Sequence, residues 1–248
     1  MQIAHDILEK LAVDPKFASY RFPWSETRKR FTLQTASSFF IGVMLDQGQQ
    51  AERSSEGANH FVETYFPEES IWEDIAATHL NRLTSICQKG WDGTSYALHY
   101  NYSKFPKALK ENAKIIVKNY ASDPRNIWNV APNDVEQIYI RFNKFVLIGD
   151  ALAKMAQFAL VRKGIAGGIQ SKQYLKAKPD IHVSKVLYRM SLSENESPKS
   201  AIRCIEMAEV SSQADLDAVL FNVGRDFCFK NKPLCDECIL NTCCKKNF

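Results

Sequence analysis

The stretch Cys228–Cys244, with the sequence CFKNKPLCDECILNTCC, decides which fold we expect for this chain. Its cysteines Cys228, Cys235, Cys238 and Cys244 follow the spacing C-x6-C-x2-C-x5-C. Connections this short leave no room for amphipathic helices between the cysteines, so the segment needs another source of order. Four thiolates around one soft metal centre supply such order. The pattern therefore predicts a metal-stabilised loop.

The metal centre can be a tetrahedral zinc ion or an iron–sulfur cluster. Zinc sites usually show two close cysteine pairs separated by a longer loop. Here one close pair is flanked by single cysteines on both sides, which favours iron and sulfur. A disulfide cluster is the alternative without a metal, although nothing marks the chain for secretion. Cys243 could replace Cys244 as the last ligand.

Two dipeptides extend the pattern, Gly224-Arg225 before the first cysteine and Lys232-Pro233 before the second. Together with the spacing they resemble the tail of endonuclease III and related DNA glycosylases. In that family the tail binds a [4Fe-4S] cluster, and Cys244 rather than Cys243 keeps the last interval. The resemblance thus implies a [4Fe-4S] cofactor on Cys228, Cys235, Cys238 and Cys244.

Composition and charge set wide limits on the function. The chain has 248 residues, is 45% hydrophobic and carries a formal charge of +4, a mild excess that permits a polyanionic partner without requiring one. The first turns carry Asp6, Glu9 and Lys10, so we expect neither a signal peptide nor a membrane span. A reducing, cytoplasmic and nucleoid-associated setting is the expectation.

Apolar residues at helical spacing predict helices over residues 3–12, 62–87 and 104–122, and another that starts after Thr32 and reaches Leu45. This last helix is followed by a polar, amide-rich turn. In the endonuclease III family a glutamine after this helix enters the duplex where the target base has left, and Gln47 matches that position. A polar connector is the alternative interpretation.

Two further stretches permit a nucleic-acid role without requiring it. Residues 17–31 mix aromatic side chains with four arginines and lysines, which could face phosphates but more often form a solvated surface. Residues 90–106 are rich in tryptophan and tyrosine, which can stack on an exposed base or close the edge of a core.

Residues 135–162 predict two helices separated by a short turn at Ile148 and Gly149. The segment resembles the helix-hairpin-helix of the same glycosylases, L-P-G-(V/I)-G-x-K-x-A, with Phe145, Ile148, Gly149 and Ala153 on matching positions. Glycine in such a turn lets backbone N–H groups approach a phosphate. The resemblance implies DNA binding through the turn, with contacts from Leu147, Ile148, Gly149 and Ala151.

Three positions of the hairpin depart from the family pattern. Val146 replaces the proline, Leu147 the first glycine and Ala151 the catalytic lysine. In bifunctional members that lysine attacks the sugar and forms a Schiff base, which an alanine cannot do. Lys154 takes the lysine role only if the alignment is shifted by three residues.

Asp180 stands where a helix N-cap belongs, before a stripe of Val183, Val186, Leu187 and Met190. The segment resembles the family motif V-D-T-H-(I/V)-x-R-V, in which the aspartate is catalytic. Breaking an N-glycosidic bond develops positive charge on the sugar, and a fixed carboxylate stabilises that charge. A plain capping aspartate is the alternative.

We therefore expect an all-α, two-lobed helix-hairpin-helix DNA glycosylase fold with an iron–sulfur cluster loop. Residues 33–165 would form a six-helix lobe that ends in the hairpin, and residues 1–32 and 166–248 the second lobe. The expected activity is monofunctional excision of a damaged, mismatched or modified base from double-stranded DNA by a monomer. The alternatives are a catalytically inactive DNA-binding protein of the same fold, and a bifunctional glycosylase/AP lyase that uses Lys154. The sequence does not reveal which base is removed.

Overall fold

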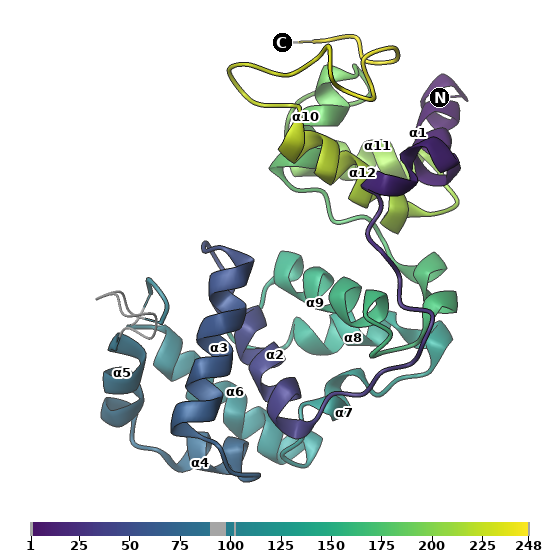
Figure 1. Cartoon of the computed structure of the whole chain (residues 1–248). Coiled ribbons are helices and arrows are strands. Elements are labelled where there is room, and N and C mark those ends of the chain that lie inside the picture. Colours follow the sequence, from purple (N-terminus) through teal and green to yellow (C-terminus); the bar gives the residue numbers. More distant parts are fainter. Residues whose placement is uncertain (1, 90–97, 102, 248) are drawn as a thin grey trace. The chain divides into compact units, whose positions relative to one another are not determined.

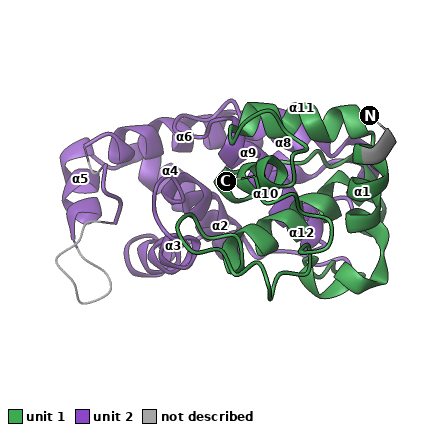
Figure 2. Ribbon diagram, turned by 90° about the horizontal axis from the view of Figure 1, so that it is seen from above, with its two compact units in different colours: residues 1–26, 168–248 green, residues 27–167 purple. Residues whose placement is uncertain are grey.

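The computed structural model describes residues 2–89, 98–101 and 103–247, and within these ranges it contains helices and loops but no strand (Figure 1). The chain divides into two compact units, coloured separately in Figure 2. Unit 1 comprises residues 1–26 and 168–248, and unit 2 comprises residues 27–167. None of the helices in the described ranges combines the length and the apolar character that a bilayer-spanning segment needs. Most of the aromatic stretch 90–106 lies outside the described residues.

Unit 2 is built around one buried helix. Its elements are α2 (Leu33–Leu45), α3 (Ala51–Tyr65), α4 (Ile71–Ala77), α5 (Leu80–Gln88), α6 (Phe105–Tyr120), α7 (Arg125–Trp128), η2 (Pro132–Asp134), α8 (Glu136–Phe142) and α9 (Asp150–Arg162). Thr32 caps α2, and Phe40 in its middle is fully buried against the rings of Trp72, Phe142 and Phe145. The predicted helix after Thr32 is therefore the centre of this unit.

The described part of the predicted six-helix lobe holds eight α-helices, so the predicted number was wrong. The predicted stretch 62–87 is broken twice, since α3 ends at Tyr65 and the extended backbone of Thr78 separates α4 from α5. The sequence analysis also missed α3 as a helix. Its buried face consists largely of small residues such as Ser54, Gly57 and Ala58, which carry little hydrophobic signal.

In unit 1, α1 and α10 pack against α12, and α11 packs against α1 and α10. Its elements are α1 (Gln2–Val13), η1 (Pro15–Tyr20), η3 (Ile169–Tyr174), α10 (Ile181–Arg189), α11 (Pro198–Ala208) and α12 (Gln213–Asp226). Apolar residues of α1, η1, α10, α11 and α12 form one core, to which Leu8 of α1 contributes a fully buried side chain. A cysteine-rich tail with turns but no helix follows α12.

Gly224 sets the distance between α10 and α12. A Cβ atom at this position would lie 2.7 Å from the backbone oxygen of His182, closer than two such atoms can approach. Only glycine therefore lets α12 pack against the first turn of α10 at this distance. Because Asp180 caps that turn, the glycine also holds the predicted catalytic residue in place.

Candidate functional site

The hairpin turn in unit 2 joins α8 to α9. Leu147 adopts a φ of +64°, the left-handed region that glycine prefers, and it is the residue that replaces the first glycine. Ile148 is buried and anchors the turn. Gly149 is exposed, caps α9, and has nothing within 4 Å of the place where a Cβ atom would stand. The N–H groups at the start of α9 are therefore open to an anion.

Asn112 of α6 holds this turn in place, and the sequence analysis missed it. Its side chain is fully buried, accepts a hydrogen bond from the N–H of Val146 at 2.8 Å and donates one to the carbonyl of Val146 at 2.9 Å. The same amide lies 3.4 Å from the sulfur of Met44, near the end of α2. An asparagine inside an apolar stripe was the available signal, because a buried amide needs hydrogen-bond partners.

The predicted DNA contact Gln47 lies in an exposed turn directly after α2. His99 donates a hydrogen bond from Nε2 to the Gln47 carbonyl at 3.1 Å and accepts one at Nδ1 from the N–H of Asn101. Burial lowers the pKa of His99, which keeps the ring in the neutral form that these two bonds need. Gly48 follows with a φ of +76°. The turn is thus held through its backbone, while the Gln47 side chain is exposed.

Ala151 is exposed at the start of α9 and offers no nucleophile. Lys154, the alternative, forms an ion pair with Asp150 at 3.1 Å, and Tyr139 donates a hydrogen bond to the same carboxylate at 2.6 Å. This bond from Tyr139, followed by the contact with Lys154, lowers the pKa of Asp150. Asp150 does not cap α9, since Gly149 occupies that position. Lys154 is therefore engaged with a neighbouring carboxylate.

Asp180 lies in unit 1 as the N-cap of α10. Its Oδ1 accepts hydrogen bonds from the N–H groups of His182 at 2.8 Å and Val183 at 3.0 Å. The residue is half-buried, and its Oδ2 has no hydrogen-bond partner among the described residues. One carboxylate oxygen therefore fixes the side chain to the helix, and the other is left to meet a ligand.

The four predicted ligand cysteines line one cavity in the tail of unit 1. Arg189 reaches the same cavity and donates a hydrogen bond to the Cys228 sulfur at 3.3 Å. Cys243 does not line it, since its thiol donates to the Leu240 carbonyl instead. All seven cysteines of the chain are free thiols. No three histidine, cysteine or acidic side chains in the described ranges are arranged to hold a single metal ion.

Solved structures superpose on nearly the whole chain. One, described as a non-covalent endonuclease III–DNA complex, is 14% identical, with a TM-score of 0.65 over 99% of this chain and 97% of the other. The chain has the endonuclease III fold. A second structure, of a thermostable thymine-DNA glycosylase, is 15% identical, with a TM-score of 0.59 over 98% of this chain and 96% of the other. No protein-family model and no curated protein matches the sequence.

These superpositions confirm the all-α helix-hairpin-helix fold expected from the cysteine spacing, the hairpin and the Asp180 segment. Within this endonuclease III fold, Gln47 and the hairpin belong to unit 2, whereas Asp180 and the cysteines belong to unit 1. The roles of the individual residues stay predictions.

A second carboxylate near Asp180 was missed by the sequence analysis. Asp217 of α12 is only 1% exposed and accepts a hydrogen bond from the N–H of Lys178 at 3.1 Å, while the Lys178 ammonium lies 3.9 Å away. Burial raises the pKa of Asp217 to about 6; Lys178 lowers it in part, and the charge of Asp180 raises it further. An aspartate inside an apolar helical stripe was the signal in the sequence.

We expect Asp217→Asn to stabilise the protein at pH 8 by up to about 3 kcal/mol, since its pKa of about 6 exceeds the usual 3.8 by about two units. A carboxyl with a raised pKa contributes stability below pH 4 that is lost as the pH rises through 6. Urea unfolding of both proteins at pH 4, 6 and 8 measures this. A variant that is less stable than the natural chain at pH 8 would show that the Lys178 ion pair outweighs burial.

Proposed function

We propose that this protein is a monofunctional DNA glycosylase. It would hydrolyse the N-glycosidic bond of a damaged, mismatched or modified base in double-stranded DNA and leave an abasic site. The observation that carries the proposal is Asp180, a helix-capping carboxylate with one unengaged oxygen, within an endonuclease III fold. One of the similar structures is itself a complex with DNA, which supports DNA as the partner. We propose that the protein acts as a monomer at the nucleoid.

Excision requires the target nucleotide to leave the duplex stack. The N–H groups at the start of α9 would bind a phosphate, held in position by Gly149 and by the left-handed backbone at Leu147. Gln47 would fill the space that the base leaves, because its side chain is exposed while His99 anchors its carbonyl. Ile148 would support the turn from within the core.

As the base departs, positive charge develops on the sugar. A carboxylate held by two backbone N–H groups cannot reorient like water, so its charge acts on the transition state without reorganisation. The unengaged Oδ2 would also orient the attacking water. A fixed charge beside a forming cation contributes several kcal/mol, on the order of a thousandfold in rate.

The alanine at position 151, which matches the lysine of bifunctional members, supports the monofunctional form of the reaction. Ala151 cannot form a Schiff base, and Lys154 is paired with Asp150. The strand should therefore break only after alkali. A protein that binds altered DNA without excising a base is the second candidate, favoured by the replacements at Leu147 and Ala151.

A cavity in unit 2 supports a role in reading the base. It has a volume of about 590 Å³, lies between α2, α3 and α9, and reaches Asp46 beside Gln47. Its wall carries hydroxyl, amide and carboxylate groups, among them Ser38, Asn59 and Glu56. A volume of a few hundred Å³ with a few polar groups suits a small planar ligand.

We propose a [4Fe-4S] cluster as the cofactor. The donor set fits, because Cys228, Cys235, Cys238 and Cys244 line one cavity and Cys243 does not. Four thiolates are the usual ligands of such a cluster, which would order the tail; a zinc ion on the same thiolates is the alternative. Arg189 would add a hydrogen bond to the Cys228 sulfur, of the kind that tunes a thiolate-bound metal centre.

The test is a set of duplexes that each carry one altered or mismatched base, incubated with the purified protein. We expect strand breaks at one or a few of these bases only after alkali, and no covalent adduct with borohydride. An adduct trapped by borohydride would contradict the monofunctional mechanism and implicate Lys154. Tight binding with no excision of any base would favour the second candidate.

A further inference from the structure

One face of α12 holds the segment that precedes α10. Residues 175–180 form no helix, so their backbone N–H groups need partners from other elements. Gln213 accepts a hydrogen bond on its Oε1 from the N–H of Ala177 at 3.1 Å. One helical turn later, Asp217 accepts a hydrogen bond on its Oδ1 from the N–H of Lys178 at 3.1 Å. Two successive residues of the segment are therefore bound to α12 through their backbone.

Pro179 makes the link from Lys178 to Asp180 short and stiff. Proline has no N–H, so Lys178 carries the last N–H group before that of Asp180. The proline ring fixes its own φ and restricts the residue before it to extended backbone. Few torsions remain to absorb a displacement of Lys178, so such a displacement moves the carboxylate two residues later.

The same face of α12 also contacts the residues that follow Asp180. The ring centroids of Phe221 and His182 lie 5.6 Å apart in an edge-to-face arrangement, and Gly224 packs against the His182 backbone. His182 in turn donates one of the two hydrogen bonds that fix Asp180. One helix therefore holds Asp180 from both sides, and Asp217 makes the hold on the side that precedes it.

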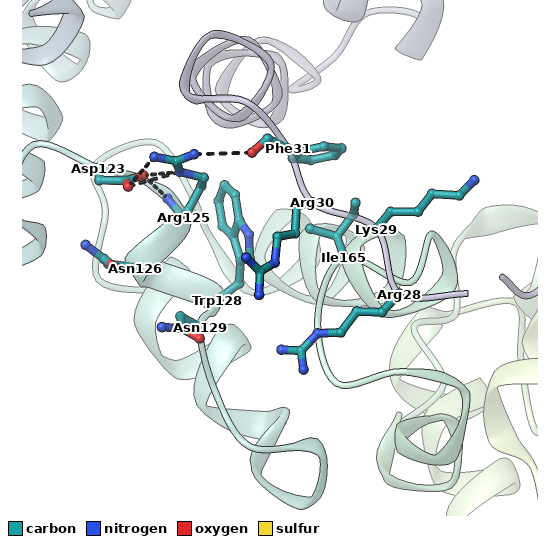
Figure 3. A pocket seen from close by; sticks show the side chains of 10 residues that line it. All are labelled: Arg28, Lys29, Arg30, Phe31, Asp123, Arg125, Asn126, Trp128, Asn129 and Ile165. Carbon is teal, nitrogen blue, oxygen red and sulfur yellow. Dashed lines mark hydrogen bonds and ion pairs between the residues drawn. The ribbon is translucent and has the colours of Figure 1, made fainter. Parts of the chain in front are cut away.

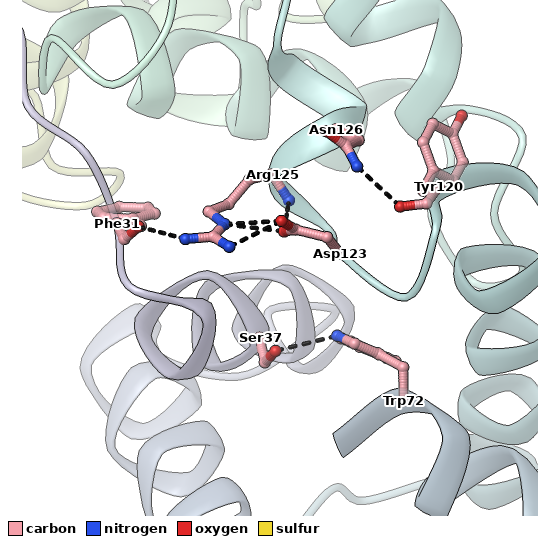
Figure 4. A network of polar contacts seen from close by, with 7 residues as sticks. All are labelled: Phe31, Ser37, Trp72, Tyr120, Asp123, Arg125 and Asn126. Carbon is pink, nitrogen blue, oxygen red and sulfur yellow. Dashed lines mark hydrogen bonds and ion pairs between the residues drawn. The ribbon is translucent and has the colours of Figure 1, made fainter. Parts of the chain in front are cut away.

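Asp217 differs from a carboxylate that serves an ion pair. Asp123 of unit 2 is of that kind, since Arg125 donates hydrogen bonds to both of its oxygens at 2.8 to 3.0 Å (Figure 4). It lines a basic pocket whose other residues include Arg28, Lys29, Arg30, Arg125 and Trp128 (Figure 3). Asp217 instead faces the Lys178 ammonium at 3.9 Å, in a buried place that raises its pKa to about 6. A carboxylate kept where its charge costs stability is typical of a functional position.

We propose that Asp217 is a positioning residue for Asp180. Its Oδ1 holds the N–H of Lys178 and thereby sets where the proposed catalytic carboxylate meets the sugar. This inference rests on the proposed function and adds a residue to its mechanism. Because the contact needs an acceptor, the amide oxygen of asparagine can take the place of the carboxylate, whereas the methyl group of alanine cannot.

Asp217→Ala and Asp217→Asn test the proposal through single-turnover excision at saturating duplex, with duplex affinity measured by fluorescence anisotropy. A misplacement of about 1 Å costs about a hundredfold in rate, so we expect a loss of this size in Asp217→Ala, with unchanged affinity. Asp217→Asn should keep most of the natural rate. Gln213→Ala removes the adjacent hydrogen bond at a half-buried position and should slow excision about tenfold.

Asp215→Ala is the matched control. Asp215 lies on the same helix, is 4% exposed, accepts a hydrogen bond from Trp24 at 2.9 Å and pairs with Lys172. Neither partner belongs to residues 175–180, so the control should lose stability but keep the natural rate and affinity. An equal loss of rate in Asp215→Ala and Asp217→Ala would indicate a general loss of packing and overturn the proposal.

A natural rate in Asp217→Ala would also overturn it; if this variant does not fold, a natural rate in Gln213→Ala would do so. The same loss in Asp217→Asn as in Asp217→Ala would show that charge matters rather than the acceptor, which contradicts the proposal.

Hydrogen exchange of residues 177–183 tests the hold without any activity. We expect faster exchange in Asp217→Ala than in the natural chain and in Asp217→Asn, because only alanine releases the N–H of Lys178. Equal exchange in all three proteins would refute the hold. A natural chain that excises no base would overturn the glycosylase function alone, and the exchange result would still decide whether Asp217 holds this segment.

Discussion

Asp180→Asn is expected to lower the single-turnover excision rate by about a thousandfold or more, with little change in duplex affinity or thermal stability. Asparagine caps a helix about as well as aspartate, so the hydrogen bonds to the N–H groups of His182 and Val183 can persist. Only the negative charge is removed. Excision of the preferred base from a saturating duplex measures the effect.

A matched substitution separates catalysis from helix capping. Asp14 caps η1 and accepts a hydrogen bond from the N–H of Lys16 at 2.9 Å, so Asp14→Asn makes the same chemical change at another N-cap of unit 1. We expect this control to excise at the natural rate. If Asp180→Asn retains full excision, Asp180 is a capping residue alone and the proposed mechanism is wrong.

Cys244→Ser is expected to remove the bound iron and the order of the tail. Structural metal centres contribute on the order of 10 kcal/mol to the folding of the segments that hold them, and the tail has turns but no helix to replace that contribution. We expect the natural chain to be yellow-brown with broad visible absorption, and Cys244→Ser to be colourless and susceptible to proteolysis after α12. Iron analysis, absorption and limited trypsin digestion measure these effects.

The neighbouring cysteine provides the control. Cys243 lies beside Cys244 but its thiol donates to the Leu240 carbonyl and does not line the cysteine cavity. Cys243→Ser should therefore keep the iron and the colour. Loss of iron in Cys243→Ser but not in Cys244→Ser would reverse the ligand assignment. A colourless natural chain with bound zinc would replace the cluster by a zinc site on the same thiolates.

The sequence by itself indicated the fold at positions whose structural or chemical role only a few residue types can fill. Three such patterns are the cysteine spacing, the glycine of the hairpin and the cap position of Asp180. Each involves residues close together in the sequence, so it can be recognised without coordinates. The apolar stripe of α2 was equally clear, because its burial on most sides requires a dense run of large residues. Through the resemblance of the motifs to the endonuclease III family, these features were sufficient to predict the fold that the superpositions confirm.

The tertiary structure alone decided which distant residues meet. The hydrogen bonds between Asn112 and Val146 and the burial of Asp217 near Asp180 depend on contacts between segments far apart in the chain. The same is true of Arg28 and Arg30, whose pocket is completed by Arg125 and Trp128 about a hundred residues later. The packing face of α3 consists largely of small residues, which carry little hydrophobic signal in the sequence. A sequence records the chemistry of each side chain, but burial and partner charges arise only when the chain folds, and these determine what each group can do.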